Sequence, residues 1–229
     1  MKFVRAITTA LFLASSSVAS ATVTYTFMAD GFTESYAQQG SAVFVFSDDG
    51  SSLSITLTDT VSPTESIQSE ISGLMFAFSS APTSIALTSV STTAIIDCSN
   101  SASPCPPGAG DSPYGWGTTW SGSSVLLGAG YDGTTFAYQP YGIVNENYIS
   151  VLGDGGLATP SNNPLLIGPV TFNFALTGLA FAPEVSSVVF AFGDPDFVAA
   201  VPEPQSLSLV AAALLAFAWL GRRKGKTAA

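Results

Sequence analysis

The sequence predicts an all-β protein, an antiparallel β-sandwich of jelly-roll type, with one helix at each end of the chain. Its middle part contains many short segments in which apolar and polar residues alternate, as in strands that bury one face. No convincing helical periodicity interrupts them. Because each predicted sheet has one apolar face, two sheets are expected to stack on each other through these faces.

The clearest pairing signal is a hairpin near the N-terminal end of this region. An apolar run at Val43–Phe46 leads into Asp48-Asp49-Gly50, and Leu53, Ile55 and Leu57 then alternate with polar residues. Acidic residues followed by glycine are typical of tight hairpin turns. The other predicted strands are 23–27, 74–78, 84–88, 92–96, 123–127, 148–152, 170–176 and 188–192.

Residues 97–122 are rich in Gly, Pro and Ser and predict a long loop. The loop contains the only two cysteines, Cys98 and Cys105. In an oxidising compartment outside the cytosol we expect these cysteines to form a disulfide, worth about 2.5 kcal/mol in the chain-entropy model. A redox or metal pair is the weaker reading, since no further Cys and no His is available as a ligand.

The charges are distributed unevenly. All six Lys and Arg residues lie near the two ends, and from Thr22 to Val201 there is no Lys, Arg or His. Fifteen of the sixteen acidic residues lie in that same segment. Such a segment cannot neutralise nucleic-acid phosphates or attract an anionic membrane. It also lacks the imidazole of a Ser-His-Asp triad and the cations of phosphoryl transfer, so we expect no enzyme.

The N-terminal residues 1–21 have the pattern of a secretory signal peptide. Lys2 and Arg5 precede a short apolar stretch, and Ala19-Ser20-Ala21 is a small-x-small site at which signal peptidase would cut. The exported domain is therefore predicted to span residues 22–200.

The C-terminal residues 201–229 have three parts. A rigid Val201-Pro202-Glu203-Pro204 is followed by an apolar stretch at about 206–221, and Arg222 and Arg223 begin a basic tail. The apolar stretch predicts a short transmembrane helix of about 24 Å, with the basic tail in the cytoplasm. A plain single-pass anchor would have a similar pattern.

The order of Pro202-Glu203-Pro204, apolar helix and Arg222-Arg223 resembles the PEP-CTERM sorting signal, a segment also labelled ice-binding protein C-terminal domain. The resemblance implies an exported protein that is anchored in the inner membrane and then processed by an exosortase. It implies that these five residues are recognised, that cleavage occurs near the Pro-Glu-Pro, and that the product reaches the cell surface or the extracellular space. Ice binding itself is little supported, since only two short threonine rows are present.

The acidic residues leave two kinds of chemistry open in the exported domain. Calcium takes oxygen ligands, and Asp48, Asp49, Asp194 and Asp196 are candidates, although hairpin and strand-ending turns explain the same residues. The pair Asp194 and Asp196 could alternatively serve a carboxylate-only glycosidase.

Aromatic residues suggest binding to sugars. Tyr114, Trp116 and Trp120 lie in a glycine-rich stretch, where exposed rings would stack on sugar faces; rings that fill the core are the alternative. We therefore expect a non-catalytic protein of the surface or exopolysaccharide matrix. A Ca²⁺-dependent carbohydrate-binding module is the alternative, and a glycosidase is a weaker one.

Overall fold

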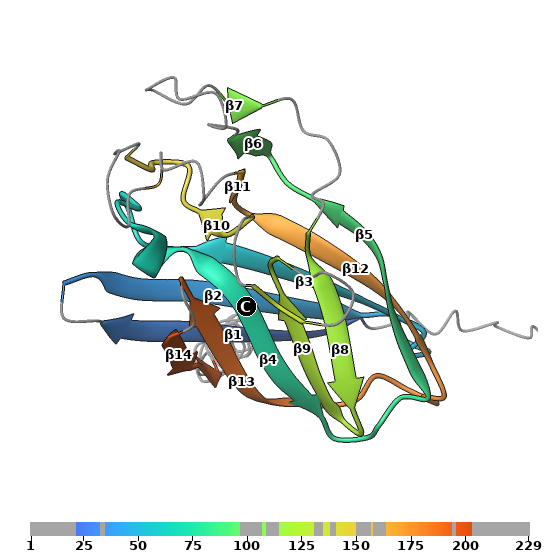
Figure 1. Ribbon diagram of the computed structural model, residues 1–229. Coiled ribbons are helices and arrows are strands. Elements are labelled where there is room, and N and C mark those ends of the chain that lie inside the picture. The colour runs from blue at the N-terminus through green and yellow to red at the C-terminus, as the bar shows by residue number, and fades with distance from the viewer. Residues whose placement is uncertain are drawn as a thin grey trace, which may run out of the picture.

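The protein is described by a computed structural model that covers residues 22–32, 35–96, 107–108, 115–130, 135–137, 141–149, 157, 164–193 and 196–202. These residues form strands and one short 3-10 turn, η1 (Ile67–Ser69). The all-β prediction is confirmed for this part of the chain. Figure 1 shows the strands arranged in two layers.

The first layer is a six-stranded sheet in which the predicted hairpin pairs as expected. Phe46 lies opposite Leu53, and Gly50 has a φ of 68° in the turn between the two strands. Alternate residues of both strands are buried. The order of strands is β15 (Val201–Pro202), β1 (Val23–Phe32), β2 (Ala37–Phe46), β3 (Ser52–Asp59), β12 (Val170–Thr177) and β5 (Ser84–Ser91).

Within the described ranges, the second layer has nine strands, and one pair of them departs from the antiparallel prediction. The short strands β10 and β11 pair in parallel, with Ile143 opposite Leu166. The order is β14 (Asp196–Ala199), β13 (Val185–Phe192), β4 (Ile71–Phe78), β10 (Ile143–Val144), β11 (Leu165–Ile167), β6 (Ala94–Ile96) and β7 (Pro107–Gly108). Beside β4 lies also β9 (Ser124–Gly128), followed by β8 (Gly117–Ser121).

The prediction that residues 97–122 form a loop is wrong at its C-terminal end, where strand β8 lies. Its residues Gly117–Ser121 pair with β9 through a turn at Gly122, whose φ of 60° favours glycine. Another predicted strand, 148–152, is reduced in its described part to a parallel bridge between Tyr148 and Thr64.

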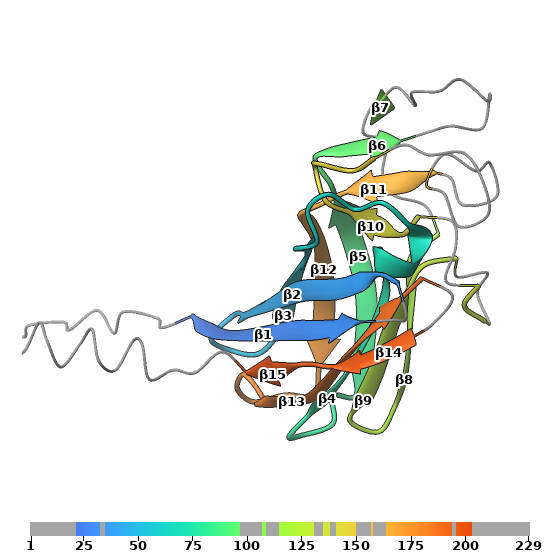
Figure 2. The same cartoon turned by 90° about the vertical axis from the view of Figure 1, so that its left-hand side faces the viewer.

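Aromatic side chains join the two layers. Phe44 of β2 meets Phe76 of β4 edge to face, with ring centroids 5.1 Å apart, and Phe46 meets Phe78 at 6.0 Å. Burial of such rings is the main source of stability in a core of this kind. The strands β6, β7, β10 and β11 lie at one end of the sandwich in both views (Figures 1 and 2).

The C-terminal end of the described chain pairs with both sheets. After β14 pairs with β13 in the second sheet, β15 pairs with β1 in the first, with Val201 opposite Met28. Figure 2 shows this continuous segment running along one side of the sandwich. The predicted sorting segment thus begins within the sheet.

Several predictions fall outside the described residues. These are the signal peptide at 1–21, the spanning helix at about 206–221 with Glu203, Pro204, Arg222 and Arg223, and the pair Cys98 and Cys105. Within the described ranges, no helix is long and apolar enough to cross a membrane.

Candidate functional site

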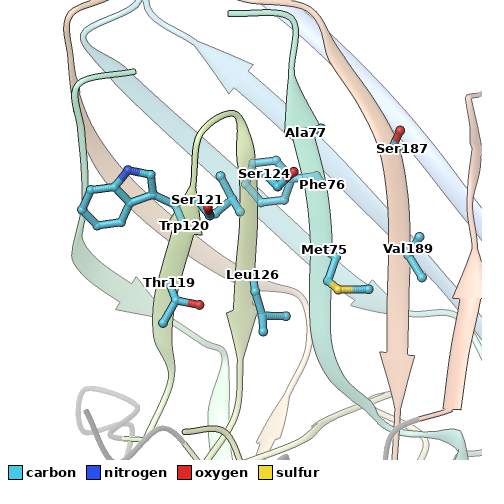
Figure 3. Close-up of a pocket in the computed structure, with 11 residues that line it drawn as sticks. Met75, Phe76, Ala77, Thr119, Trp120, Ser121, Ser124, Leu126, Ser187 and Val189 are labelled. Carbon is cyan, nitrogen blue, oxygen red and sulfur yellow. The ribbon is translucent and has the colours of Figure 1, made fainter. Parts of the chain in front are cut away.

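A shallow groove of about 360 Å³ lies on the outer face of the second sheet. Its floor is a row of four residues that stand opposite one another on neighbouring strands: Thr119, Leu126, Met75 and Val189. Figure 3 shows their side chains side by side across β8, β9, β4 and β13. Because all four side chains are partly exposed, they present an apolar surface to solvent.

The groove is hollow because the next row is made of small residues. Ser121 lies opposite Ser124, and Ser124 lies opposite Ala77. On β13 the register shifts between Ser186 and Val189, and Ser187 lines the groove with a positive φ of 51°. A β-bulge of this kind redirects a side chain, and here it adds a third serine hydroxyl to the rim.

Trp120 adds an aromatic side chain beside the groove. It shares a row with the buried Val125 and Phe76, but β8 is the outer strand here, so the indole is 43% exposed. Figure 3 shows the indole on the outer side of β8, away from β9. No described residue lining the groove is charged. Because side chains alternate along a strand, the Trp120 ring lies at the outer edge of the sheet and not among the hydroxyls of Thr119 and Ser121. An uncharged groove with serine and threonine hydroxyls and an exposed ring at its edge suits a neutral, polyhydroxylated ligand.

The other predicted aromatic ligands differ from Trp120. Trp116 is only 6% exposed, its Nε1 donates to the carbonyl oxygen of Tyr141 at 2.7 Å, and its ring packs on Phe172. The structure therefore places Trp116 in the core, which corrects the prediction that it lies on a sugar-binding surface. Tyr114 lies outside the described residues.

The predicted calcium ligands Asp48 and Asp49 lie in the hairpin turn between β2 and β3. The Oδ1 atom of Asp49 accepts hydrogen bonds from Ser47 Oγ at 2.7 Å and from the Ser51 amide at 2.9 Å. These bonds lower the pKa of the Asp49 carboxyl to about 2. Such bonds are what a hairpin turn alone requires.

The second predicted acidic pair is described only in part. Asp196 accepts a hydrogen bond from Gln38 Nε2 at 3.3 Å at the start of β14, and Asp194 lies outside the described residues. Within the described ranges, no group of three or more Asp, Glu, Cys or His side chains is placed to hold a metal ion.

A different pair of acidic residues, Asp59 and Glu70, is fully buried, and the sequence did not predict this. Asp59, at the end of β3, has no exposed surface. Its Oδ2 accepts from Thr64 Oγ1 at 2.7 Å and from the Asn145 amide at 3.2 Å, and its Oδ1 accepts from the Val61 amide at 2.9 Å. Burial nevertheless raises the pKa of Asp59 to about 7, against the lowering effect of these bonds.

Glu70 follows η1 and is also fully buried. Neither its Oε1 nor its Oε2 has a hydrogen-bond partner, and the same holds for Ser72 Oγ. Burial, and then the negative charge of Asp59, raise the pKa of Glu70 well above its usual value of 4.5. Because neither carboxylate reaches solvent, this pair cannot meet a polymeric sugar and does not form a glycosidase site.

One signal for Asp59 was available in the sequence. Leu53, Ile55 and Leu57 share the buried face of β3, and the same two-residue period places position 59 on that face. No comparable pattern marks Glu70, since it lies between a 3-10 turn and a strand.

Comparison with known proteins identifies the C-terminal segment. Residues 200–224 match the family model of the PEP-CTERM protein-sorting motif. The match confirms that the predicted sorting motif is present. Pro202, Glu203, Pro204, Arg222 and Arg223 all lie within it, and their recognition by an exosortase stays a prediction. A motif of this kind indicates an exported protein that an exosortase processes. No curated protein and no solved structure matches the chain.

Proposed function

We propose that this chain is a non-catalytic protein of the cell surface or exopolysaccharide matrix, delivered there by signal peptidase and exosortase. The match of residues 200–224 to the sorting motif carries the proposal. On this proposal the chain crosses the inner membrane, is held there by its C-terminal helix, and is then cut near Pro202-Glu203-Pro204.

The position of the motif relative to the sandwich supports such a route. The pairing of Val201 with Met28 means that the matched segment follows the folded domain without a linker. A cut after Pro202 would leave β14 and every central strand in place. The product would therefore retain its complete core.

The exosortase step predicts a change in mass. In cells that contain an exosortase, the mature protein should end near residues 201–204 and lack Arg222 and Arg223. Mass spectrometry of the protein recovered from cells with and without the enzyme measures this directly. Replacing Glu203→Ala should reduce processing, whereas the exposed Glu184→Ala is the matched control. A full-length tail in both strains would show a plain membrane anchor instead.

A second candidate function, carbohydrate binding, is favoured by the groove beside Trp120. The hydroxyls of Thr119, Ser121 and Ser124 offer hydrogen-bond partners in the groove, and the exposed indole of Trp120 offers a stacking surface at its outer edge. Ca²⁺ dependence through Asp48, Asp49, Asp194 and Asp196 belongs to this candidate and stays a prediction. Extracellular polysaccharide would be the ligand.

Replacing Trp120→Ala should weaken binding to a neutral polysaccharide by about tenfold, because a stacking contact worth about 1.4 kcal/mol is lost. A glycan array of neutral hexose polymers would identify the probe, and calorimetry would give the Kd. Phe181→Ala is the control, since Phe181 is another exposed aromatic residue that does not line the groove. Equal loss in both variants, or no binding by the unaltered protein, would remove this candidate.

A further inference from the structure

Two fully buried carboxylates from opposite layers interact at one end of the sandwich. Asp59 ends β3 of the first sheet, and Glu70 immediately precedes β4 of the second. The two residues lie near each other, since Asp59 pairs with Gly40 and Gly40 packs against the side chain of Ile71, the residue next to Glu70. Burying two negative groups together is costly unless a positive charge or a set of hydrogen bonds compensates them.

The hydrogen bonds compensate only one of the two groups. Asp59 receives three donors, of which two bond to Oδ2 and one to Oδ1. Since a carboxylate offers about four acceptor positions, Oδ1 retains one for a further partner. Glu70 receives no donor at either oxygen.

The chain itself cannot supply a compensating cation. No Lys, Arg or His occurs from Thr22 to Val201, so no side chain of the exported domain carries a positive charge. A proton on Glu70 would remove the charge, but it would still leave the carbonyl oxygen of the carboxyl group without a hydrogen-bond donor. A bound cation would satisfy both oxygens at once.

We propose that Glu70 and Asp59 bind one divalent cation, Ca²⁺, at this end of the sandwich. Ca²⁺ fits because all the available ligand atoms are oxygens, and because it accepts a bidentate carboxylate and irregular coordination geometry. Two carboxylates balance its charge. The hydroxyl of Ser72, two residues beyond Glu70 and equally without a partner, is a further oxygen in this segment.

The backbone of Glu70 is held by hydrogen bonds at both its amide and its carbonyl group. The Glu70 amide donates to the carbonyl oxygen of Ile67 at 3.3 Å, and its carbonyl oxygen accepts from the Gly193 amide at 3.0 Å. A Cβ built on Gly142 would overlap the Glu70 carboxyl group, so glycine at this position makes room for it. A preformed ligand of this kind loses little entropy when it binds a cation.

The test uses the full chain in detergent, stripped of metal with EDTA and returned to chelator-free buffer at pH 8. Addition of CaCl₂ at about one hundred times the Kd should raise Tm by about 5–10 °C. Calorimetry should give one bound Ca²⁺ per chain. Glu70→Gln should lose both effects, while the exposed Glu65→Gln should keep them.

The remaining outcomes separate this site from its competitors. If Asp49→Asn removes Ca²⁺ binding and Glu70→Gln preserves it, the ion belongs to the hairpin turn and the proposal is wrong. If CaCl₂ changes neither the Tm of the unaltered protein nor its calorimetric signal, the buried pair holds protons and the proposal is equally overturned. That second measurement decides the question even if Glu70→Gln does not fold. Neither result depends on exosortase processing.

Discussion

Replacing Phe44→Ala should lower the free energy of unfolding by about 3–5 kcal/mol, the usual cost of removing a fully buried phenylalanine. Phe44 has no exposed surface and packs edge to face against Phe27 and Phe76, with ring centroids at 5.7 and 5.1 Å. Truncation therefore removes ring contacts both within the first sheet and across to the second. Urea denaturation followed by tryptophan fluorescence measures the loss.

The matched control is Phe181→Ala. Phe181 is 67% exposed between β12 and β13, so its removal should change stability by no more than about 0.5 kcal/mol. A loss below about 1 kcal/mol for Phe44→Ala would contradict the arrangement in which this ring joins β2 to β4.

The core of the sandwich could be predicted because each of its main strands carries its own pattern. Leu53, Ile55 and Leu57 alternate with polar residues, and all three are buried as the pattern predicts. The same holds for Phe172 and Phe174 in β12. A period of two is a local property, so a single strand is enough to reveal it.

Strand β8 and the groove could not be predicted in this way. The segment Gly117–Ser121 contains two threonines and a tryptophan, which favour strands, but it is short and lies within a stretch rich in glycine, proline and serine that is typical of a loop. The groove exists because Thr119, Leu126, Met75 and Val189 come into one row through the register of four strands. Register between strands that are distant in the sequence is not visible in any one of them.

The buried acidic residues could not be predicted from the sequence for the same reason. The sequence points to Asp48 and Asp49 because two acids and a glycine adjoin, yet these residues serve a turn. Asp59 and Glu70 stand alone in the sequence, and only the packing of two sheets brings their charges together. Composition showed that no cation was available to the domain, but it could not show which acids needed one.

In the presence of EDTA, the protein should be most stable near pH 4 and should lose several kcal/mol as the pH rises to 8. Burial raises the pKa of Asp59 from 3.8 to about 7, and that of Glu70 well above 4.5. Between the unfolded and folded pKa values, the folded state therefore binds more protons than the unfolded state. Its stability must then fall as pH rises. For Asp59 alone, the rise of the pKa from 3.8 to about 7 corresponds to about 4 kcal/mol of folding free energy.

Urea denaturation at pH 4 to 8 measures this slope, and three comparisons identify its origin. Glu70→Gln should flatten it, because a neutral amide has no proton to lose. Saturating CaCl₂ should also flatten it if the pair binds the cation, because the ion then stabilises the ionised form. Asp49→Asn should leave it unchanged over this range, since hydrogen bonds lower the pKa of Asp49 to about 2 and its titration lies below pH 4.

The sign of this slope distinguishes the buried pair from ordinary surface carboxylates. In many proteins stability rises from pH 4 towards neutrality, because carboxylates paired with Lys or Arg must be ionised to contribute. The chain contains no such partner between Thr22 and Val201, so ion pairing between side chains of this segment cannot produce a rising slope. Mutual repulsion among the fifteen acidic residues of the segment acts in the same direction as the buried pair. Stability that increased from pH 4 to 8 in EDTA would therefore contradict the burial of both Asp59 and Glu70.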